Sequence, residues 1–445
     1  MAIDTAVDAE TGKSHPHYRR NFAAFWADYG FFGVAMAFIN HNTVLPSFVR
    51  QLTDSPLLIG LSGTIQTAGW LFPQLIAANY LGDKAEKKRY ILIPSAIGRP
   101  VPFVLALALF LGAARHPTLV LTILFASLAL LWMTDALATV AWFDVLGKTV
   151  PARQRGRLFG LGQVTSGLLT VGAGLAINYV LSDAGPPFPD NYAFLFVAAG
   201  ALFVLSWLAI ATIKEPSETP AAENGGSQPP FLRRLTHIWK RDRDFRLFLA
   251  VRLLVGLNGL ATPFYVIFAT DRLGLGQEVV GWFTSAQVIG SIAGGVILGA
   301  VNERRGGRQT IQVGVGAGLL APLWALLLPL WLPAGHPWLV YGCSLVFVAL
   351  GMLQSNFVQG FFNYLLDLAP ADERATYIAL SNTLNGVVLW PVALVGGAIL
   401  KMTDNSYPTL FTITATGMGL GLLCTVWLAE PRSPSHADAP PATAT

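Results

Sequence analysis

The stretch WFDVLGKTVPARQRGRLFGL, residues 142–161, recurs in altered form as FFNYLLDLAPADERATYIAL, residues 361–380. The alignment pairs Phe143 with Phe362, Pro151 with Pro370 and Arg155 with Arg374. A second pair of stretches, GTIQTAG at 63–69 and TSAQVIG at 284–290, matches at nearly the same offset and pairs Gln66 with Gln287. Matches that keep both order and spacing indicate that the chain consists of two duplicated halves.

Both halves are strongly apolar. The 445 residues are 53% hydrophobic and 12% charged, with a mean hydropathy of +0.53, whereas soluble domains carry roughly 25% charged residues. Apolar runs long enough to cross a bilayer as helices, about 20 residues each, recur from Phe22 to Leu428. They do not alternate as the strands of a membrane barrel do. The composition therefore predicts an all-α membrane protein.

We expect twelve transmembrane helices, divided six and six by a polar linker. The expected spans are 22–49, 57–81, 90–113, 117–147, 157–181, 191–213, 244–271, 278–301, 309–333, 337–367, 376–402 and 406–430. The stretch KEPSETPAAENGGSQPP at 214–230 has the composition of a flexible linker. The next stretch, FLRRLTHIWKRDR, separates apolar from basic residues on a helical wheel. It predicts an amphipathic helix on the membrane surface, with a solvated basic linker as the alternative.

The resulting domains are a tail (1–21), a first six-helix bundle (22–213), a linker (214–243), a second six-helix bundle (244–430) and a second tail (431–445). Lysine and arginine gather in alternate loops. With the N-terminus inside, the outer loops and adjoining helix ends carry only Arg50, Arg115, Arg272 and Lys401. The positive-inside rule then predicts a multi-pass protein of the cell (inner or plasma) membrane with both termini in the cytoplasm.

Three loops resemble motifs of the major facilitator superfamily. The loop NYLGDKAEKKR, 79–89, matches the signature G-x-L-a-D-r-x-G-r-k at Leu81, Asp83, Lys84, Lys87 and Lys88, with Asn79 and Glu86 in place of its glycines. The stretch GAVNERRGGR, 299–308, keeps Gly299, Arg304, Gly306 and Arg308, with Glu303 as the acid. The pattern P-x-x-x-R-G appears as Pro151, Arg155 and Gly156. Together with the spans and the repeat, these motifs make the chain similar to that family over residues 20–430.

This resemblance implies two six-helix bundles related by a pseudo-two-fold axis, with helices one, four, seven and ten lining a central cavity. It also implies a gating role for the motif residues, which are Asp83, Lys84, Lys87, Lys88, Arg155, Glu303, Arg304, Arg308 and Arg374. In particular, Asp83 is expected to contact the start of helix eleven when the cytoplasmic side is closed.

Four ionisable residues stand out inside the expected spans: Asp28, Arg99, Asp135 and Arg252. Charge within a bilayer is costly, so such residues are candidates for function. Asp135 and Arg252 lie at similar depths in helices four and seven. We expect either a gate or proton-responsive pair across the halves, or a static structural pair. Asp28 and Arg99 share one half, and for them a structural pair is favoured.

Uncharged polar residues complete the candidate solute and ion pathway. They are Asn42 in helix one, Asn258 in helix seven, and Gln354, Ser355, Asn356 and Gln359 in helix ten. A single amide is better explained by bonding between helices, but the set indicates a polar, mostly uncharged site. Trp132, Phe357 and Trp390 are candidates for stacking on a solute.

The sequence contains no phosphate-binding glycine loop and no metal-ligand spacing among its histidines. We therefore expect no enzymatic activity, no cofactor and no nucleic-acid partner. The expected function is secondary active transport of a small amphipathic or weakly polar organic solute by alternating access. We expect coupling to a proton or cation, export as the direction, and membrane lipids as partners. Two alternatives stay open: an uptake carrier or uniporter, and a non-transporting assembly factor or sensor of the same fold.

Overall fold

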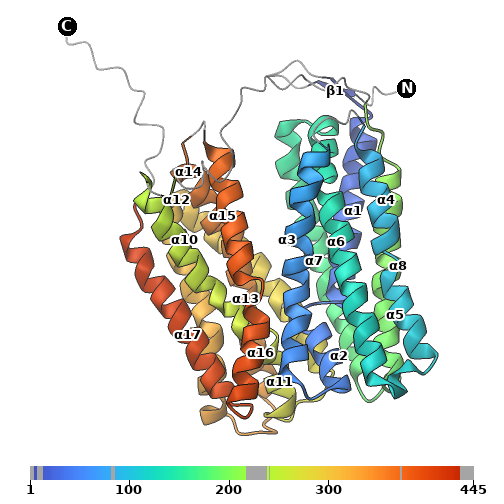
Figure 1. Ribbon diagram of the computed structural model, residues 1–445, viewed down its shortest axis with the longest axis vertical. Coiled ribbons are helices and arrows are strands. Elements are labelled where there is room, and N and C mark those ends of the chain that lie inside the picture. Colours follow the sequence, from blue (N-terminus) through green and yellow to red (C-terminus); the bar gives the residue numbers. More distant parts are fainter. Residues whose placement is uncertain are drawn as a thin grey trace.

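The computed structural model describes residues 5–7, 14–81, 86–216, 238–239, 241–370 and 373–430. Two three-residue strands, β1 (Thr5–Val7) and β2 (Ser14–Pro16), pair antiparallel ahead of the first helix. Long helices make up the bundle that follows (Figure 1), which confirms the all-α prediction. The predicted amphipathic helix after residue 230 and the tail from residue 431 lie mainly outside the described residues.

The described part of the first half has eight helices, which form six spans. They are α1 (Tyr18–Phe38), α2 (Val44–Leu52), α3 (Pro56–Leu81), α4 (Lys88–Gly98), α5 (Val101–Phe110), α6 (Pro117–Thr149), α7 (Ala152–Leu181) and α8 (Asp190–Ala211). A short 3-10 turn, η1 (Ala113–Arg115), precedes α6. The helices α1 and α2 form one broken span, as do α4 and α5, between which Pro100 supplies no backbone N–H.

The second half repeats this plan. Its elements are α10 (Arg243–Gly256), η2 (Leu257–Leu260), α11 (Phe264–Asp271), α12 (Val279–Trp331), α13 (Leu339–Asn356), a π-helical segment η3 (Phe357–Phe362), α14 (Asn363–Leu368), α15 (Arg374–Leu389), α16 (Val392–Met402), α17 (Tyr407–Cys424) and η4 (Thr425–Trp427). The long α12 contains two spans. Its backbone leaves helical geometry at Gly306, where φ is 80°, and the segments flanking α12 meet through the hydrogen bond from Gly335 N to the Leu273 carbonyl.

Nine stretches of the described chain are long and apolar enough, taken singly, to cross a membrane. Because α12 crosses twice, and α1–α2 and α3 provide two more crossings, the twelve-span prediction is confirmed. Four of the expected spans, 22–49, 90–113, 244–271 and 376–402, are each formed by two helices. The span expected as a single helix over 22–49 is interrupted after Phe38 and resumes at Val44, since the run Asn40–His41–Asn42 places polar groups where the helix would continue.

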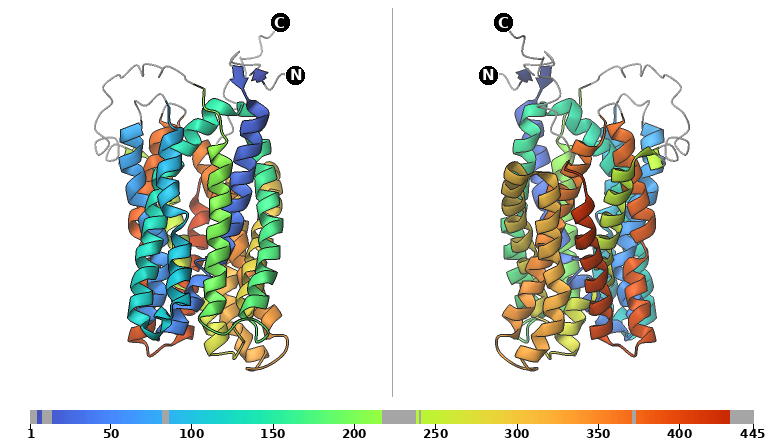
Figure 2. Two further views of the ribbon diagram at one scale, coloured as in Figure 1. Left: turned by 90° about the vertical axis from the view of Figure 1, so that its right-hand side faces the viewer. Right: turned by 90° about the vertical axis from the view of Figure 1, so that its left-hand side faces the viewer.

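The two halves stand side by side, and their helices run between the same two faces of the molecule (Figures 1 and 2). We call the end at which α1 begins and α17 ends the terminal face, and the other end the opposite face. The helices α3 and α15 diverge toward the terminal face, whereas α3 and α16 approach each other toward the opposite face (Figure 1). The halves are therefore packed most closely at the opposite face.

Glycine permits this close packing. A Cβ on Gly60 of α3 would lie 2.3 Å from the Ala393 carbonyl oxygen of α16. A Cβ on Gly281 of α12 would lie 2.1 Å from the Gly174 carbonyl oxygen of α7. Small residues let helix backbones approach in this way, so that backbone meets backbone across the seam between the halves.

Polar contacts reinforce the same seam. The Thr43 and Thr284 hydroxyls lie 2.7 Å apart, Ser47 Oγ donates to Gln277 Oε1 at 2.5 Å, and Asn178 Nδ2 donates to the Glu278 carbonyl at 2.8 Å. The Thr43 and Ser47 side chains are buried, so these bonds form in a region from which water is largely excluded. They hold the opposite face closed.

Candidate functional site

A cavity of about 810 Å³ lies between the two halves. It receives side chains from α1, α3, α6 and α7 of the first half and from α12, α13 and α15 of the second. Seven carboxamides line it: Asn40, Gln66, Gln163, Gln287, Gln354, Asn382 and Asn385. Among the described residues that line it, Asp135 supplies the only carboxylate. The cavity is thus rich in groups that both donate and accept hydrogen bonds and poor in fixed charge.

The duplication is visible in this lining. Gln66 and Gln287, which the repeat pairs, both face the cavity from opposite halves. Gln287 is buried and accepts a hydrogen bond from Asn40 Nδ2 at 3.5 Å. Asp135 of α6 and its counterpart Gln354 of α13 also both line it. The repeat therefore signals which polar residues meet at the centre, although the candidate list omitted Gln66 and Gln287.

A second lobe of about 330 Å³ adjoins the first and shares His41, Thr67, Gln287, Gln354 and Asn385 with it. It lies at the two helix breaks, between α1 and α2 and between α10 and α11. Three predicted residues line it, Asn42, Asn258 and Gln354, and so do the aromatic candidates Phe357 and Trp390. Discontinuous helices expose polar groups near the middle of a membrane, where transporters bind their solutes.

Asp135 and Arg252 do not pair in this conformation. Asp135 Oδ2 accepts a hydrogen bond from Trp70 Nε1 at 3.2 Å. Arg252 donates from Nη1 to Ser381 Oγ at 2.5 Å and from Nη2 to Asn382 Oδ1 at 3.2 Å. Within the described part of the chain, neither residue has an ion-pair partner. Arg252 reaches the cavity lining only through Asn382, which itself faces the larger lobe.

Asp28, predicted for the pathway, lies outside both lobes as the structure describes them and instead joins helices of the first half. Its Oδ1 lies 3.2 Å from Nη1 of Arg99, and both residues are buried, with 4% and 6% of their surfaces exposed. Trp142 Nε1 donates to Oδ2 at 2.8 Å, and Ser206 Oγ donates to Oδ1 at 2.5 Å. The carboxylate thus bonds to three residues from other segments of the first half, as expected of a structural pair.

Replacing Arg99 with methionine should destabilise the protein because it leaves Asp28 buried without a counter-charge. Removing one partner of a buried ion pair costs about 3–5 kcal/mol. Thermal unfolding of the purified protein in detergent would detect this loss. Arg252→Met is the matched control and should cost less, because Arg252 is bonded only by neutral groups and is partly exposed. Equal unfolding temperatures for Arg99→Met and the wild type would contradict the structural role.

Of the four polar residues predicted in helix ten, only Gln354 lines the cavity as the structure describes it. Gln354 lines both lobes. Ser355 Oγ donates to the Ser291 carbonyl at 2.5 Å, and the fully buried Asn356 donates to the Ile311 carbonyl at 3.4 Å. Gln359, in the π-helical segment, is half-buried and belongs to neither lobe as described. The predicted polar cluster is therefore divided between the cavity lining and contacts with α12.

Part of the first predicted gating motif lies outside the described residues, namely Asp83 and Lys84. The described part forms an ionic cluster at the terminal face. Lys87 Nζ lies 2.6 Å from Asp144 Oδ2, and Lys148 Nζ lies 3.1 Å from Glu215 Oε1. The Glu215 carboxylate also accepts the backbone N–H groups of Lys87 and Lys88, at 2.9 and 2.7 Å. It thereby holds the end of the sixth span against the start of α4, where a helix attracts negative charge.

The remaining motif residues bind backbone carbonyls or face outward. Lys88 Nζ donates to Ala211 and Ile213, Arg155 donates to Gly147 and Val150, and Arg308 donates to Val426. Glu303, Arg304 and Arg374 are exposed. A repeated Glu-Pro pair in the sequence also marks this region, although the motif prediction did not include it. Glu215-Pro216 and Glu430-Pro431 follow the last span of each half, and the Glu430 carboxylate lies where a Cβ on Gly306 would point.

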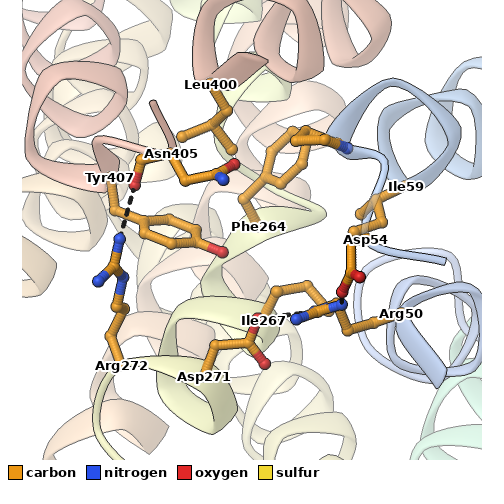
Figure 3. A pocket seen from close by; sticks show the side chains of 11 residues that line it. Arg50, Asp54, Ile59, Phe264, Ile267, Asp271, Arg272, Leu400, Asn405 and Tyr407 are labelled. Atoms are coloured by element: carbon orange, nitrogen blue, oxygen red, sulfur yellow. Dashed lines mark hydrogen bonds and ion pairs between the residues drawn. The ribbon is translucent and has the colours of Figure 1, made fainter. Parts of the chain in front are cut away.

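At the opposite face, charged residues from both halves surround a pocket of about 460 Å³ (Figure 3). Arg50 of α2 donates from Nε to Asp271 Oδ2 of α11 at 2.7 Å and also pairs with Asp54. Arg272 donates to the Asn405 carbonyl at 3.3 Å and lies over the Tyr407 ring. The Arg50–Asp271 ion pair joins the halves outside the seam of buried hydroxyl and amide bonds.

Residues 29–392 match the Major Facilitator Superfamily family profile. The chain belongs to this family. It is therefore a multi-pass membrane protein and a secondary transporter, not an enzyme. No curated protein sequence matches the chain.

Solved structures show the same fold at low sequence identity. The nucleoside transporter NupG is 15% identical with a TM-score of 0.66, covering 92% of this chain and 99% of that one. A D-xylose–proton symporter is 13% identical with a TM-score of 0.65, covering 93% and 98%. A bacterial homologue of the iron transporter ferroportin in an inward-facing state is 12% identical with a TM-score of 0.63, covering 92% and 98%. These similarities extend over both halves of the chain.

Proposed function

We propose that this transporter carries a neutral, hydrogen-bonding organic solute by alternating access, with Asp135 coupling transport to a proton or cation. The observation that carries the proposal is the cavity between the halves, in which seven carboxamides accompany one carboxylate. Carboxamides bind hydroxyl and N–H groups without requiring a counter-charge. A solute with a full charge of either sign would find few opposite charges there.

Two further features support a neutral ring as the solute. Trp70 and Trp132 line the larger lobe, and an indole face packs well against the apolar face of a ring. Two of the similar solved proteins are named for nucleoside and for D-xylose transport, and both solutes are uncharged rings that carry hydroxyl groups. The cavity volume is within the range that suits such a molecule, about 300–1,000 Å³.

We infer that the terminal face is cytoplasmic and that the conformation is inward-facing. The basic motif residues Lys87, Lys88, Arg304 and Arg308 lie at the terminal face, as the positive-inside rule requires for the cytoplasm. The seam that joins the halves at Gly60 and Gly281, together with the Arg50–Asp271 pair outside it, would then close the cavity to the outside. In the outward-facing state, this seam opens and the cytoplasmic ends of the halves approach each other.

The comparisons do not support the predicted export direction, and the proposal does not depend on it. An uptake carrier or uniporter would use the same cavity. A non-transporting factor of this fold is less consistent with the structure, because the cavity is not filled by packed aromatic residues and Asp135 lies in its wall. Transport measured in both directions would decide between export and uptake.

Gln287→Leu should reduce transport about ten-fold, because the change removes a buried carboxamide at the centre of the cavity and keeps its size. The measurement is uptake of labelled pentoses and nucleosides into proteoliposomes, with and without an imposed proton gradient. Gln359→Leu is the matched control, since Gln359 lies outside both lobes as described. Failure of every neutral solute to be transported would reject the proposed solute class. Equal losses in both variants would reject the proposed cavity.

A further inference from the structure

We propose that the smaller lobe is a subsite for hydrogen-bond donors, so that a solute binds with a donor-bearing ring edge against Asn258 and Asn385 of the second half. The donors can be hydroxyl groups or ring N–H groups. This inference rests on the proposed function, because it states how a neutral solute is oriented in the cavity. It also predicts that residues of the second half, not of the first, recognise which donors the solute carries on that edge.

The orientation of the Asn258 carboxamide follows from its neighbour Thr262. The Thr262 hydroxyl donates to the Asn258 backbone carbonyl at 2.9 Å. Since that hydroxyl has one hydrogen, its oxygen can only accept from the Asn258 side chain, and Asn258 Nδ2 lies 3.1 Å away. The amide nitrogen is therefore held by Thr262. The side-chain oxygen Oδ1 is left buried with no protein partner among the described residues.

The corresponding asparagine of the first half is arranged differently. Asn40 lies in the break between α1 and α2, as Asn258 lies in the break between α10 and α11. Asn40 Oδ1 accepts the backbone N–H of Asn42 at 2.8 Å, and its Nδ2 donates across the seam to Gln287. Its oxygen is thus occupied within the protein. Of these two related positions, the one in the second half keeps an acceptor available to a solute.

Asn385 provides a second acceptor in the same lobe. It lines both lobes, and its Oδ1 is also buried without a protein partner in the described chain. Leaving a buried acceptor unsatisfied is costly, so both oxygens favour a ligand that brings hydrogens to them. Phe357 and Trp390 line the lobe beside these oxygens. Two acceptors and two aromatic side chains together suit the edge and faces of a ring that carries donors.

The test pairs protein variants with methylated solutes. The probes are D-xylose, uridine and their singly methylated derivatives, in each of which one O–H or N–H hydrogen is replaced by methyl. Affinity is measured by competition with a transported labelled parent in proteoliposomes. Asn258→Ala should weaken the parent about ten-fold. For the derivative that lacks the matching donor, Asn258→Ala and the wild type should bind equally well, because the lost bond is already missing.

Matched variants separate recognition from folding. Asn258→Asp keeps an acceptor and should retain the preference for the parent over the methylated probe, whereas Asn385→Ala should abolish the preference at a second donor position. Asn40→Ala should leave the ratio between parent and methylated probes as in the wild type. Each variant is first compared with the wild type by size-exclusion profile and unfolding temperature. Asn385→Ala, at a different helix, provides the same readout if Asn258→Ala does not fold.

The outcomes distinguish the two proposals. If neutral probes are transported but Asn258→Ala and Asn385→Ala weaken every derivative by the same factor, the donor subsite is rejected and the proposed function stands. A different result would be that solute affinity depends on sodium, and does so only when Asn258 is present. The lobe would then be a cation site, and the inference would be wrong. If no neutral probe binds or is transported, the proposed function fails, and the subsite with it.

Discussion

Gly281→Val should abolish transport while leaving a folded protein. Gly281 of α12 faces α7 of the other half, and a Cβ there would lie 2.1 Å from the Gly174 carbonyl oxygen and 2.4 Å from the Asn178 backbone nitrogen. Both obstacles are backbone atoms, so no side-chain rotation relieves the contact. The halves must instead separate at the opposite face, which excludes the conformation observed here. A transporter that cannot reach one of its two states cannot complete its cycle, so we expect a loss of at least about 100-fold.

Accessibility labelling would show the cause of this loss. A cysteine introduced at Thr43, which is fully buried at the seam, should react slowly with a polar maleimide in an otherwise wild-type background and rapidly in Gly281→Val. Gly295→Val is the matched control. Gly295 lies on the same helix, α12, and a Cβ there meets nothing within 4 Å. Normal transport by Gly281→Val, or equal losses in both valine variants, would show that the seam does not have to close tightly.

The sequence predicts the fold because the decisive signals are long and repeated. The apolar runs, the polar linker and the repeated order of motifs extend over the whole chain. The fold prediction therefore does not depend on any single residue. The interruption between Phe38 and Val44 illustrates the limit. There the apolar run continues on both sides, and the polar groups at the break find partners in the other half. Asn40 bonds to Gln287, and Thr43 bonds to Thr284. The sequence alone does not show these partners.

The sequence predicts how deep in the membrane each candidate residue lies, but not which side of its helix faces the cavity. A polar residue in a span has a depth that the sequence gives, whereas the side it faces depends on packing. Asp135, Asn42, Asn258 and Gln354 line the lobes. Asp28 is also a polar residue inside a span, but it bonds to Arg99 within its own half.

Two cavity residues had no signal to identify them. Asn382 and Asn385 lie on α15, in the eleventh span, and the family resemblance assigned the cavity to helices one, four, seven and ten. Only the packing of α15 beside α10 shows that they face the cavity. Gln66 and Gln287 differ in this respect, because their pairing in the repeat could have identified them as cavity residues.

Asp135→Asn should eliminate gradient-driven accumulation and leave solute exchange between the two sides of the membrane nearly intact. Asp135 has the only carboxylate among the described residues lining the larger lobe, so its replacement removes an acidic group there that can be charged in one state and neutral in the other. Asparagine has nearly the same shape, and its carbonyl oxygen can still accept from Trp70 Nε1. Accumulation under an imposed proton gradient should fall at least about ten-fold, with exchange changed by less than about two-fold.

Trp70→Phe is the control for this substitution, since it removes the hydrogen bond and keeps the carboxylate, and it should preserve accumulation. If Asp135→Asn accumulates solute as the wild type does, Asp135 is not the coupling residue.

A double-mutant cycle with Arg252 tests the expected pair between the halves. Asp135 and Arg252 are held apart here by Trp70 on one side and by Ser381 and Asn382 on the other. If Asp135 and Arg252 meet when the terminal face closes, each side chain neutralises the charge of the other in that state. Replacing one of them then leaves the other without a counter-charge. Asp135→Asn and Arg252→Gln should then each slow the return of the solute-free transporter to the outward-facing state, and the double variant should be no slower than either single variant. Additive effects in the double variant would show that the two residues act separately and that the gate closes through other contacts.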